Sequence, residues 1–187
     1  MKKDILERYE RTGDDEIIVD ISARKIEDLY NNFDKKSHFM KKDLNQDLVA
    51  YLIESVREID GERFVIRFNF EIPTQEEFFQ RVQNSVNRFF LYMQEHEHAK
   101  MKEMLRKSTI FFGIGAVLAG VSIFMNQSDW MEKSIAFAVV AEGLSVAAWV
   151  SLWEALATFL IRWMPYKKKI LLYKNIANAK IIFNVES

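Results

Sequence analysis

The chain of 187 residues contains no cysteine, so it can form no disulfide bond and can use no thiolate as a nucleophile or metal ligand. This absence is compatible with a reducing, cytoplasmic setting for any soluble part. Residues 1–16 carry charges throughout and lack the apolar run that a signal peptide requires. The sequence therefore predicts neither cleavage nor export.

The sequence also lacks the motifs of common catalytic sites: it has no glycine-rich phosphate loop, no nucleophile elbow and no paired-carboxylate motif. His96 and His98 would lie about 200° apart around a helix, which is the wrong geometry for joint metal binding. The lysines between residues 35 and 42 are bracketed by acidic residues, which favours a solvated loop. We therefore expect no enzymatic activity, no metal or other cofactor, and no nucleic-acid partner.

Charged residues are nearly missing from two long stretches, although 28% of the chain is charged and 49% is hydrophobic. Residues 108–126 carry no charge, and residues 134–161 carry only two glutamates. At about 1.5 Å per residue, the first stretch covers roughly the 30 Å hydrocarbon core of a bilayer. The second stretch reaches the same thickness near Trp153 and continues for about ten residues more, so it predicts a helix that tilts or emerges into the interface.

The short segment 127–133 separates the two stretches, which predicts an antiparallel transmembrane hairpin. Basic residues flank its open end, whereas the turn contains only Lys133. The positive-inside rule then predicts that both termini are cytoplasmic, with an aromatic belt that places Trp130 at the outer face. A buried hairpin inside a soluble protein is the alternative. The flanking basic residues are Lys100, Lys102, Arg106, Lys107, Arg162, Lys167, Lys168 and Lys169.

Small residues four positions apart occur as two overlapping pairs in the first stretch: Gly115 with Ala119, and Ala116 with Gly120. This spacing lets a second helix backbone approach closely, which is how helices associate in lipid. The pattern is explained either by packing within the hairpin alone or by additional packing between copies in a homo-oligomer. The second stretch offers matching small residues at Ala136, Ala141, Gly143, Ala147 and Ala148.

The two glutamates of the second stretch are expected at different depths. Glu142 would lie near the bilayer midplane, where a carboxylate must be protonated, hydrogen-bonded or facing water. Ser122 and Ser145 are the neutral partners expected nearby, so these three residues are a candidate packing contact or permeation site. Glu154 would lie at the cytoplasmic interface, and Arg162, two turns further on, is expected to approach it.

Sequence outside these stretches predicts a small cytoplasmic α/β domain. Residues 16–21 and 63–72 read as strands, and the second alternates strictly, with phenylalanine or isoleucine on one face. Two helical stripes lie between them, which gives a β-α-α-β unit. The stripes are Ile26, Leu29, Tyr30 and Phe33, then Leu44, Leu48, Leu52 and Ile59.

A long helix is predicted from Thr74, which forms a capping-box pattern with Glu77, into the first membrane stretch. A short helix over residues 166–175 and a third strand over 180–185 follow the hairpin. The predicted fold is thus an α+β membrane protein in which a transmembrane hairpin is inserted into a small α/β domain. Its predicted parts are residues 1–107, 108–163 and 164–187.

Spaced tryptophans before a proline and a basic run characterise the region after the hairpin: Trp149, Trp153-Glu154, Phe159-Leu160, Trp163, Pro165, Lys167–Lys169 and Tyr173. In these residues, and loosely in the preceding long helix, about half the chain resembles an uncharacterised family of bacterial two-span inner-membrane proteins. The resemblance implies a bacterial inner-membrane setting. It implies no activity, cofactor or catalytic residue.

These features favour a non-enzymatic inner-membrane protein, namely a homo-oligomeric scaffold or adaptor whose cytoplasmic domain binds a partner protein. The alternative is a small oligomeric ion or proton channel, or effector, gated through the long helix and with Glu142 lining the conduction path.

Overall fold

The computed structural model describes residues 6–31, 44–72, 75–127 and 134–185. The chain divides into two compact units. Met1–Glu95 and Lys169–Ser187 form one, which we call the sheet unit, and His96–Lys168 form the other, which we call the hairpin unit. The predictions made for Phe33, for the lysines between residues 35 and 42, and for Thr74, Trp130 and Lys133 lie outside the described residues.

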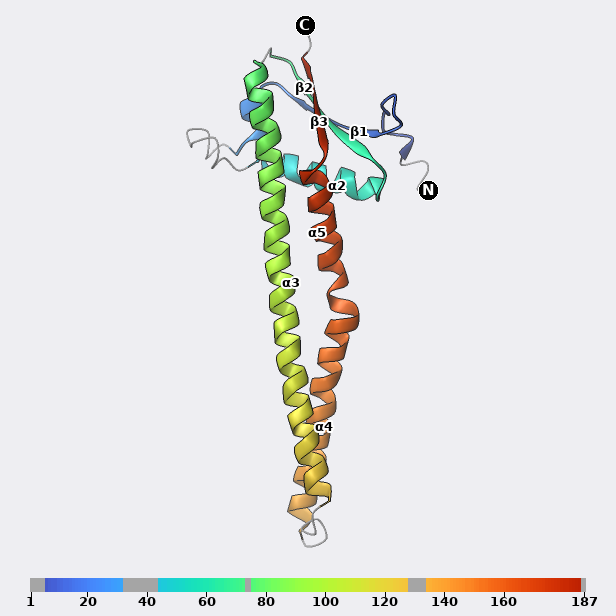
Figure 1. Ribbon diagram of the computed structural model, residues 1–187, viewed down its shortest axis with the longest axis vertical. Coiled ribbons are helices and arrows are strands. Elements are labelled where there is room, and N and C mark those ends of the chain that lie inside the picture. Colours follow the sequence, from blue (N-terminus) through green and yellow to red (C-terminus); the bar gives the residue numbers. More distant parts are fainter. Residues whose placement is uncertain (1–5, 32–43, 73–74, 128–133, 186–187) are drawn as a thin grey trace. The chain divides into compact units, whose positions relative to one another are not determined.

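Three parallel strands form the sheet, in the order β1-β2-β3 (Figure 1). They are β1 (Ile17–Ala23), β2 (Phe64–Phe70) and β3 (Lys180–Val185), and Ile66 of β2 is in register with Val19 of β1 and Ile181 of β3. The sequence predicted a mixture of helices and a sheet, and it predicted that the last strand returns to this sheet. Both features are confirmed.

Parallel neighbours cannot be joined by a tight turn, so each pair needs a crossover. Between β1 and β2 the crossover contains a 3-10 helix, η1 (Ile26–Leu29), and α2 (Gln46–Ile59). Between β2 and β3 it contains α3 (Glu76–Asn126), α4 (Ile135–Ala157), the π-helical turn η4 (Thr158–Arg162) and α5 (Met164–Ala177). The predicted single long helix before the turn is confirmed, because α3 runs unbroken for 51 residues.

The core of the sheet unit is built from β2 and from apolar helix positions spaced at about one turn. Phe68 and Phe70 of β2 are fully buried, together with Phe90 of α3 and Ile176 of α5. Aromatic stacking extends this core, since the rings of Phe79 and Phe183 lie 4.4 Å apart and that of Phe183 lies 5.9 Å from Phe68. The predicted apolar face of β2 is therefore the inner face of the sheet.

The polar positions of β2 are satisfied by β1, its neighbour in the sheet. Arg67 lies in register with Asp20 and binds both of its carboxylate oxygens, at 2.5 and 2.7 Å. It also donates to Glu10 at 2.6 Å, and Asn69 donates to Asp20 at 3.1 Å. Hydrogen bonds first to Asp20 and then to Glu10 raise the pKa of Arg67 above its ordinary value, so the guanidinium stays charged.

The first helical stripe predicted in this unit was wrong in type. Among the described residues of this stripe, the chain forms the four-residue 3-10 helix η1, and Tyr30 is extended, with φ −112° and ψ 154°. Tyr30 and Leu44 instead form an isolated antiparallel bridge, and the Asn45 N–H donates to the Leu29 carbonyl at 2.9 Å. Ile26 and Leu29 lie on one face in both an α-helix and a 3-10 helix. Their burial therefore does not distinguish the two helix types.

The second predicted stripe forms a helix, but Leu44 lies outside it. Asn45 is the N-cap of α2, and its side chain accepts a 2.8 Å hydrogen bond from the Asp47 N–H. At the other end Asp60 is left-handed and Gly61 has φ +94°, a combination that stops the helix and starts the turn into β2.

We expect Phe68→Ala to destabilise the sheet unit by about 3–5 kcal/mol, because the large side chain is removed from the fully buried inner face. Hydrogen exchange of the β2 amides in the full-length chain measures this as faster exchange. Tyr51→Ala, at a position 47% exposed on α2, is the control and should change protection by less than about 0.5 kcal/mol. Equal protection in both variants would contradict the core described above.

Candidate functional site

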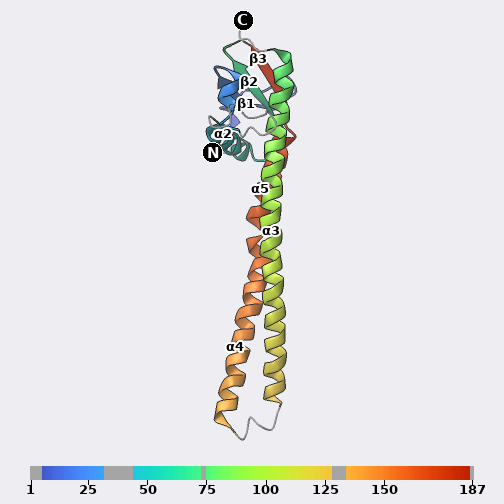
Figure 2. The same ribbon diagram turned by 90° about the vertical axis from the view of Figure 1, so that its left-hand side faces the viewer.

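Two helices of the described chain are long and apolar enough to cross a membrane. In the hairpin unit, α3 and α4 run antiparallel and side by side in both views (Figures 1 and 2). In their most apolar stretches of 18 residues, only 17% and 11% of the residues are buried within the protein. Most apolar side chains of these helices therefore point outward. The bulky ones include Phe112, Val117, Phe124, Val139, Val146, Trp149 and Trp153.

The contact between the two helices is a narrow seam of small residues spaced by seven. Between residues 108 and 126 of α3 the buried positions are Ser108, Gly115 and Ser122, and on α4 they are Ala141, Ala148 and Ala155. A seven-residue period keeps one face of each helix on the partner when the two supercoil with a left-handed twist. The side chains there are small, so the backbones can approach closely.

Two serines bind the helices together along this seam. Ser108 Oγ donates to the Ala155 carbonyl, and Ser122 Oγ donates to the Ala141 carbonyl, each at 3.1 Å. Between them, a Cβ added to Gly115 would lie 2.8 Å from Leu152 Cγ and 3.1 Å from the Leu152 backbone nitrogen. Gly115 is therefore a position at which the seam requires the absence of a side chain.

The four predicted packing residues of α3 separate onto different faces. Gly115 lies in the seam and Ala119 is half-buried, whereas Ala116 and Gly120 are exposed. A Cβ added to Gly120 would meet nothing within 4 Å. The pair Gly115 and Ala119 thus serves the hairpin, while the pair Ala116 and Gly120 faces outward. The seam instead follows a seven-residue spacing that the sequence also contains: Ser108, Gly115 and Ser122 on α3, and Ala141, Ala148 and Ala155 on α4.

Glu142 lies on the exposed side of α4, one position beyond the seam. The expected contact with Ser122 is not formed, and the Ser122 hydroxyl instead donates to the backbone carbonyl of Ala141. Ser145 is half-buried, and among the described residues no side chain pairs with Glu142.

Glu154 and Arg162 form an ion pair that engages both carboxylate oxygens, with Arg162 Nη2 lying 3.2 Å from Glu154 Oε2. Eight residues of a regular helix would turn the arginine about 80° away from the glutamate. The π-helical turn η4 lies between them and absorbs an extra residue. It therefore returns Arg162 to the face that carries Glu154, and Thr158 Oγ1 donates to the Glu154 carbonyl at 3.1 Å within this turn.

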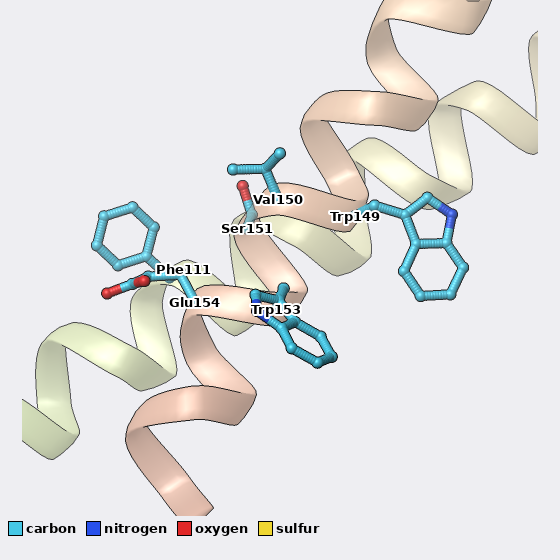
Figure 3. A pocket seen from close by; sticks show the side chains of 6 residues that line it. All are labelled: Phe111, Trp149, Val150, Ser151, Trp153 and Glu154. Atoms are coloured by element: carbon cyan, nitrogen blue, oxygen red, sulfur yellow. The ribbon is translucent and has the colours of Figure 1, made fainter. Parts of the chain in front are cut away.

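A groove runs along the outside of the hairpin next to this ion pair. One part, of about 500 Å³, is lined by Phe111 of α3 and by five residues of α4, including Trp149, Trp153 and Glu154 (Figure 3). A second part, of about 360 Å³, shares Phe111 and Glu154 with the first and adds charged side chains. The two parts meet at Phe111 and Glu154, and Arg162 lines the second part.

The sheet unit has a separate polar groove of about 390 Å³ beside β1 and α2. Tyr9 lines it and donates a 2.8 Å hydrogen bond to Glu58. Burial, and then this bond to Glu58, raise the pKa of the Tyr9 hydroxyl. Within the described ranges, no group of three or more His, Asp or Glu side chains is arranged to hold a metal ion.

Comparisons of the chain with protein-family profiles, with curated proteins and with solved structures found no match.

We expect Gly115→Leu to destabilise the hairpin by about 1–3 kcal/mol or more, because the new side chain would overlap Leu152 at the seam. Loss of helical circular dichroism during a titration from mild detergent into sodium dodecyl sulfate measures the change. Gly120→Leu adds the same side chain where there is open space and should shift the midpoint little. Similar shifts for the two variants would contradict the seam.

Proposed function

We propose that the protein is a non-enzymatic bacterial inner-membrane protein in which the hairpin unit spans the bilayer and the sheet unit lies in the cytoplasm. The outward apolar side chains of α3 and α4 carry this proposal, since monomeric soluble proteins rarely expose contiguous apolar surface of this extent. Both apolar segments are helical, so their backbone groups are satisfied internally, as a bilayer requires.

The proposed orientation has both termini in the cytoplasm. Basic residues lie at the end of the hairpin unit that joins the sheet unit in sequence, before residue 108 on α3 and from Arg162 onward after α4. Positively charged flanks are retained on the cytoplasmic side during insertion. Trp153 and Trp163 are near this end of the apolar stretch, where tryptophan favours the boundary between lipid and water.

Self-association is the second part of the proposal, and Glu142 supports it. A carboxylate on the outer face of an apolar helix costs about 3 kcal/mol at the centre of a bilayer unless a partner or water satisfies it. The hairpin supplies no partner among its described residues, so a second copy of the chain is the partner we propose. Gly143, beside Glu142, is also exposed and would admit a close neighbour.

The role we propose is that of a homo-oligomeric scaffold or adaptor. The sheet is completed by strands from both sides of the hairpin, so a single folded unit is attached to the membrane anchor at two points of the chain. The surface of this unit would bind a cytoplasmic protein partner. In an oligomer each subunit would carry one copy of that surface. A small ion or proton channel is the second candidate, because the outward carboxylate of Glu142 would line a path enclosed by several copies.

Membrane topology can be measured by single-cysteine labelling, because the natural chain has no cysteine. In spheroplasts, a membrane-impermeant maleimide should label Gln127→Cys at the end of α3, because this residue would face the outside. Lys174→Cys on α5 should be labelled only after lysis. The unaltered chain is the control and should remain unlabelled. Labelling of Lys174→Cys in intact spheroplasts, or of neither variant before lysis, would contradict the proposed topology.

Self-association can be measured by native mass spectrometry of the protein released from lipid nanodiscs. We expect more than one chain per complex, and we expect Glu142→Leu to weaken association about 3-fold to 30-fold by removing a polar contact between helices. Val139→Leu, also on the exposed side of α4, is the matched control and should have little effect. A purely monomeric natural protein would refute the oligomer.

The same preparation separates the scaffold from the channel. Glu142→Gln retains a hydrogen-bonding side chain, so assembly should persist in both cases. In a channel this substitution should change proton or ion flux into liposomes. In a scaffold there should be no flux with either the natural chain or the variant.

A further inference from the structure

The groove on the hairpin unit has one polar and one apolar end. The apolar end lies along Trp149, Val150 and Trp153 of α4, and the two tryptophan residues are 71% and 69% exposed. The polar end is lined by three cationic and two anionic side chains together with Tyr166. Phe111 and Glu154 line both ends, so one elongated amphipathic molecule would contact both. The charged residues are Lys100, Lys107, Arg162, Glu103 and Glu154.

Charge in and around the polar end favours an anion. Arg162 pairs with Glu154, and Lys107 pairs with Glu103 at 2.7 Å, but all four side chains are between 42% and 66% exposed and so remain open to exchange of partners. Residues 96–107 and 154–168 of the hairpin unit together contain seven Lys or Arg and three Glu. An arriving anion therefore meets an excess of positive charge, even though each carboxylate already has a cation.

We propose that this groove binds one anionic phospholipid, with its phosphate at Arg162 and Lys107 and an acyl chain along Phe111, Trp149 and Trp153. Arginine and lysine both bind phosphate through charge-assisted hydrogen bonds, and arginine can do so with two parallel N–H groups. In the complex each cation would contact both the phosphate and its own glutamate, so each cation would keep an anionic partner. The site lies at the boundary between apolar and basic sequence, where lipid headgroups would be found if the hairpin spans a bilayer as proposed.

The π-helical turn has a defined role in this site. Without the extra residue in η4, Arg162 would be turned about 80° away from the face that carries Glu154. With it, Arg162 and Glu154 line the same polar end. The turn therefore places a cation next to the apolar groove, at the position where a lipid phosphate joins its acyl chains.

The test is a titration of the full-length protein in detergent with phosphatidylglycerol or phosphatidylcholine of identical acyl chains, in which native mass spectrometry counts bound lipid. We expect the natural chain to prefer phosphatidylglycerol. Lys107→Gln combined with Arg162→Gln should weaken that binding by about 100-fold, because each lost contact to a charged group is worth about tenfold.

A matched double variant controls for net charge. Lys102→Gln combined with Lys168→Gln removes the same two charges from exposed positions that do not line the groove, and it should change affinity less than about threefold. Equal losses in the two double variants would show a diffuse basic band and overturn the site. Equal affinity of the natural chain for the two lipids would overturn the proposed headgroup.

Glu154→Gln distinguishes a lipid site from a structural ion pair. If the glutamate competes with phosphate for Arg162, its neutralisation should tighten phosphatidylglycerol binding several-fold. A pair that serves only to hold the helix would give unchanged or weaker binding, which would overturn the proposal. This site rests on the proposed membrane location, but the two can fail separately. A chain with the expected cysteine labelling and no lipid preference loses the lipid site alone.

Discussion

Parallel pairing of β3 with β2 is the constraint on which the rest of this fold depends. Parallel strands require a crossover that leaves one end of the sheet and returns to the other. Here that crossover contains about a hundred residues and includes the whole hairpin unit, from α3 to α5. Both apolar helices therefore lie between the second and third strands in sequence, and Phe183 of β3 packs against the core to which β2 contributes.

The seam shows how two helices can approach closely through small residues. Its buried positions are serine, glycine and alanine, and half-buried leucines such as Leu144 and Leu152 flank them. Hydrogen bonds from Ser108 and Ser122 to backbone carbonyls also join the helices. The large apolar side chains are left for the outer surface. This is the reverse of the sheet unit, where phenylalanines fill the interior and polar groups face outward.

Sequence patterns predicted those features that depend on strong periodicity or on long runs. The alternation in β2, the run without glycine or proline over residues 75–112, and the uncharged stretch over residues 108–126 each leave few alternatives. The 3-10 helix η1 was missed because Ile26 and Leu29, three positions apart, are spaced correctly for either helix type.

Direction around a helix was harder to predict than position along it. Ser122 and Glu142 were matched by their expected depth, but the serine points to the Ala141 carbonyl and the glutamate points outward. The ion pair of Glu154 with Arg162 was expected from proximity in sequence, whereas the π-helical turn that aligns them has no simple sequence signature. Among the small residues of α3, the buried ones are those that repeat every seven positions from Ser108 to Ser122.

The separation of aromatic residue types between the two units also gives the protein two intrinsic optical reporters. All four tryptophans belong to the hairpin unit, and the sheet unit contains five of the six tyrosines. Tryptophan emission excited at the red edge therefore reports on the hairpin unit alone, including the exposed rings of Trp149 and Trp153. Tyrosine absorbance reports mainly on the sheet unit. Loss of order in one unit can thus be followed separately from the other in the unlabelled, unmodified chain.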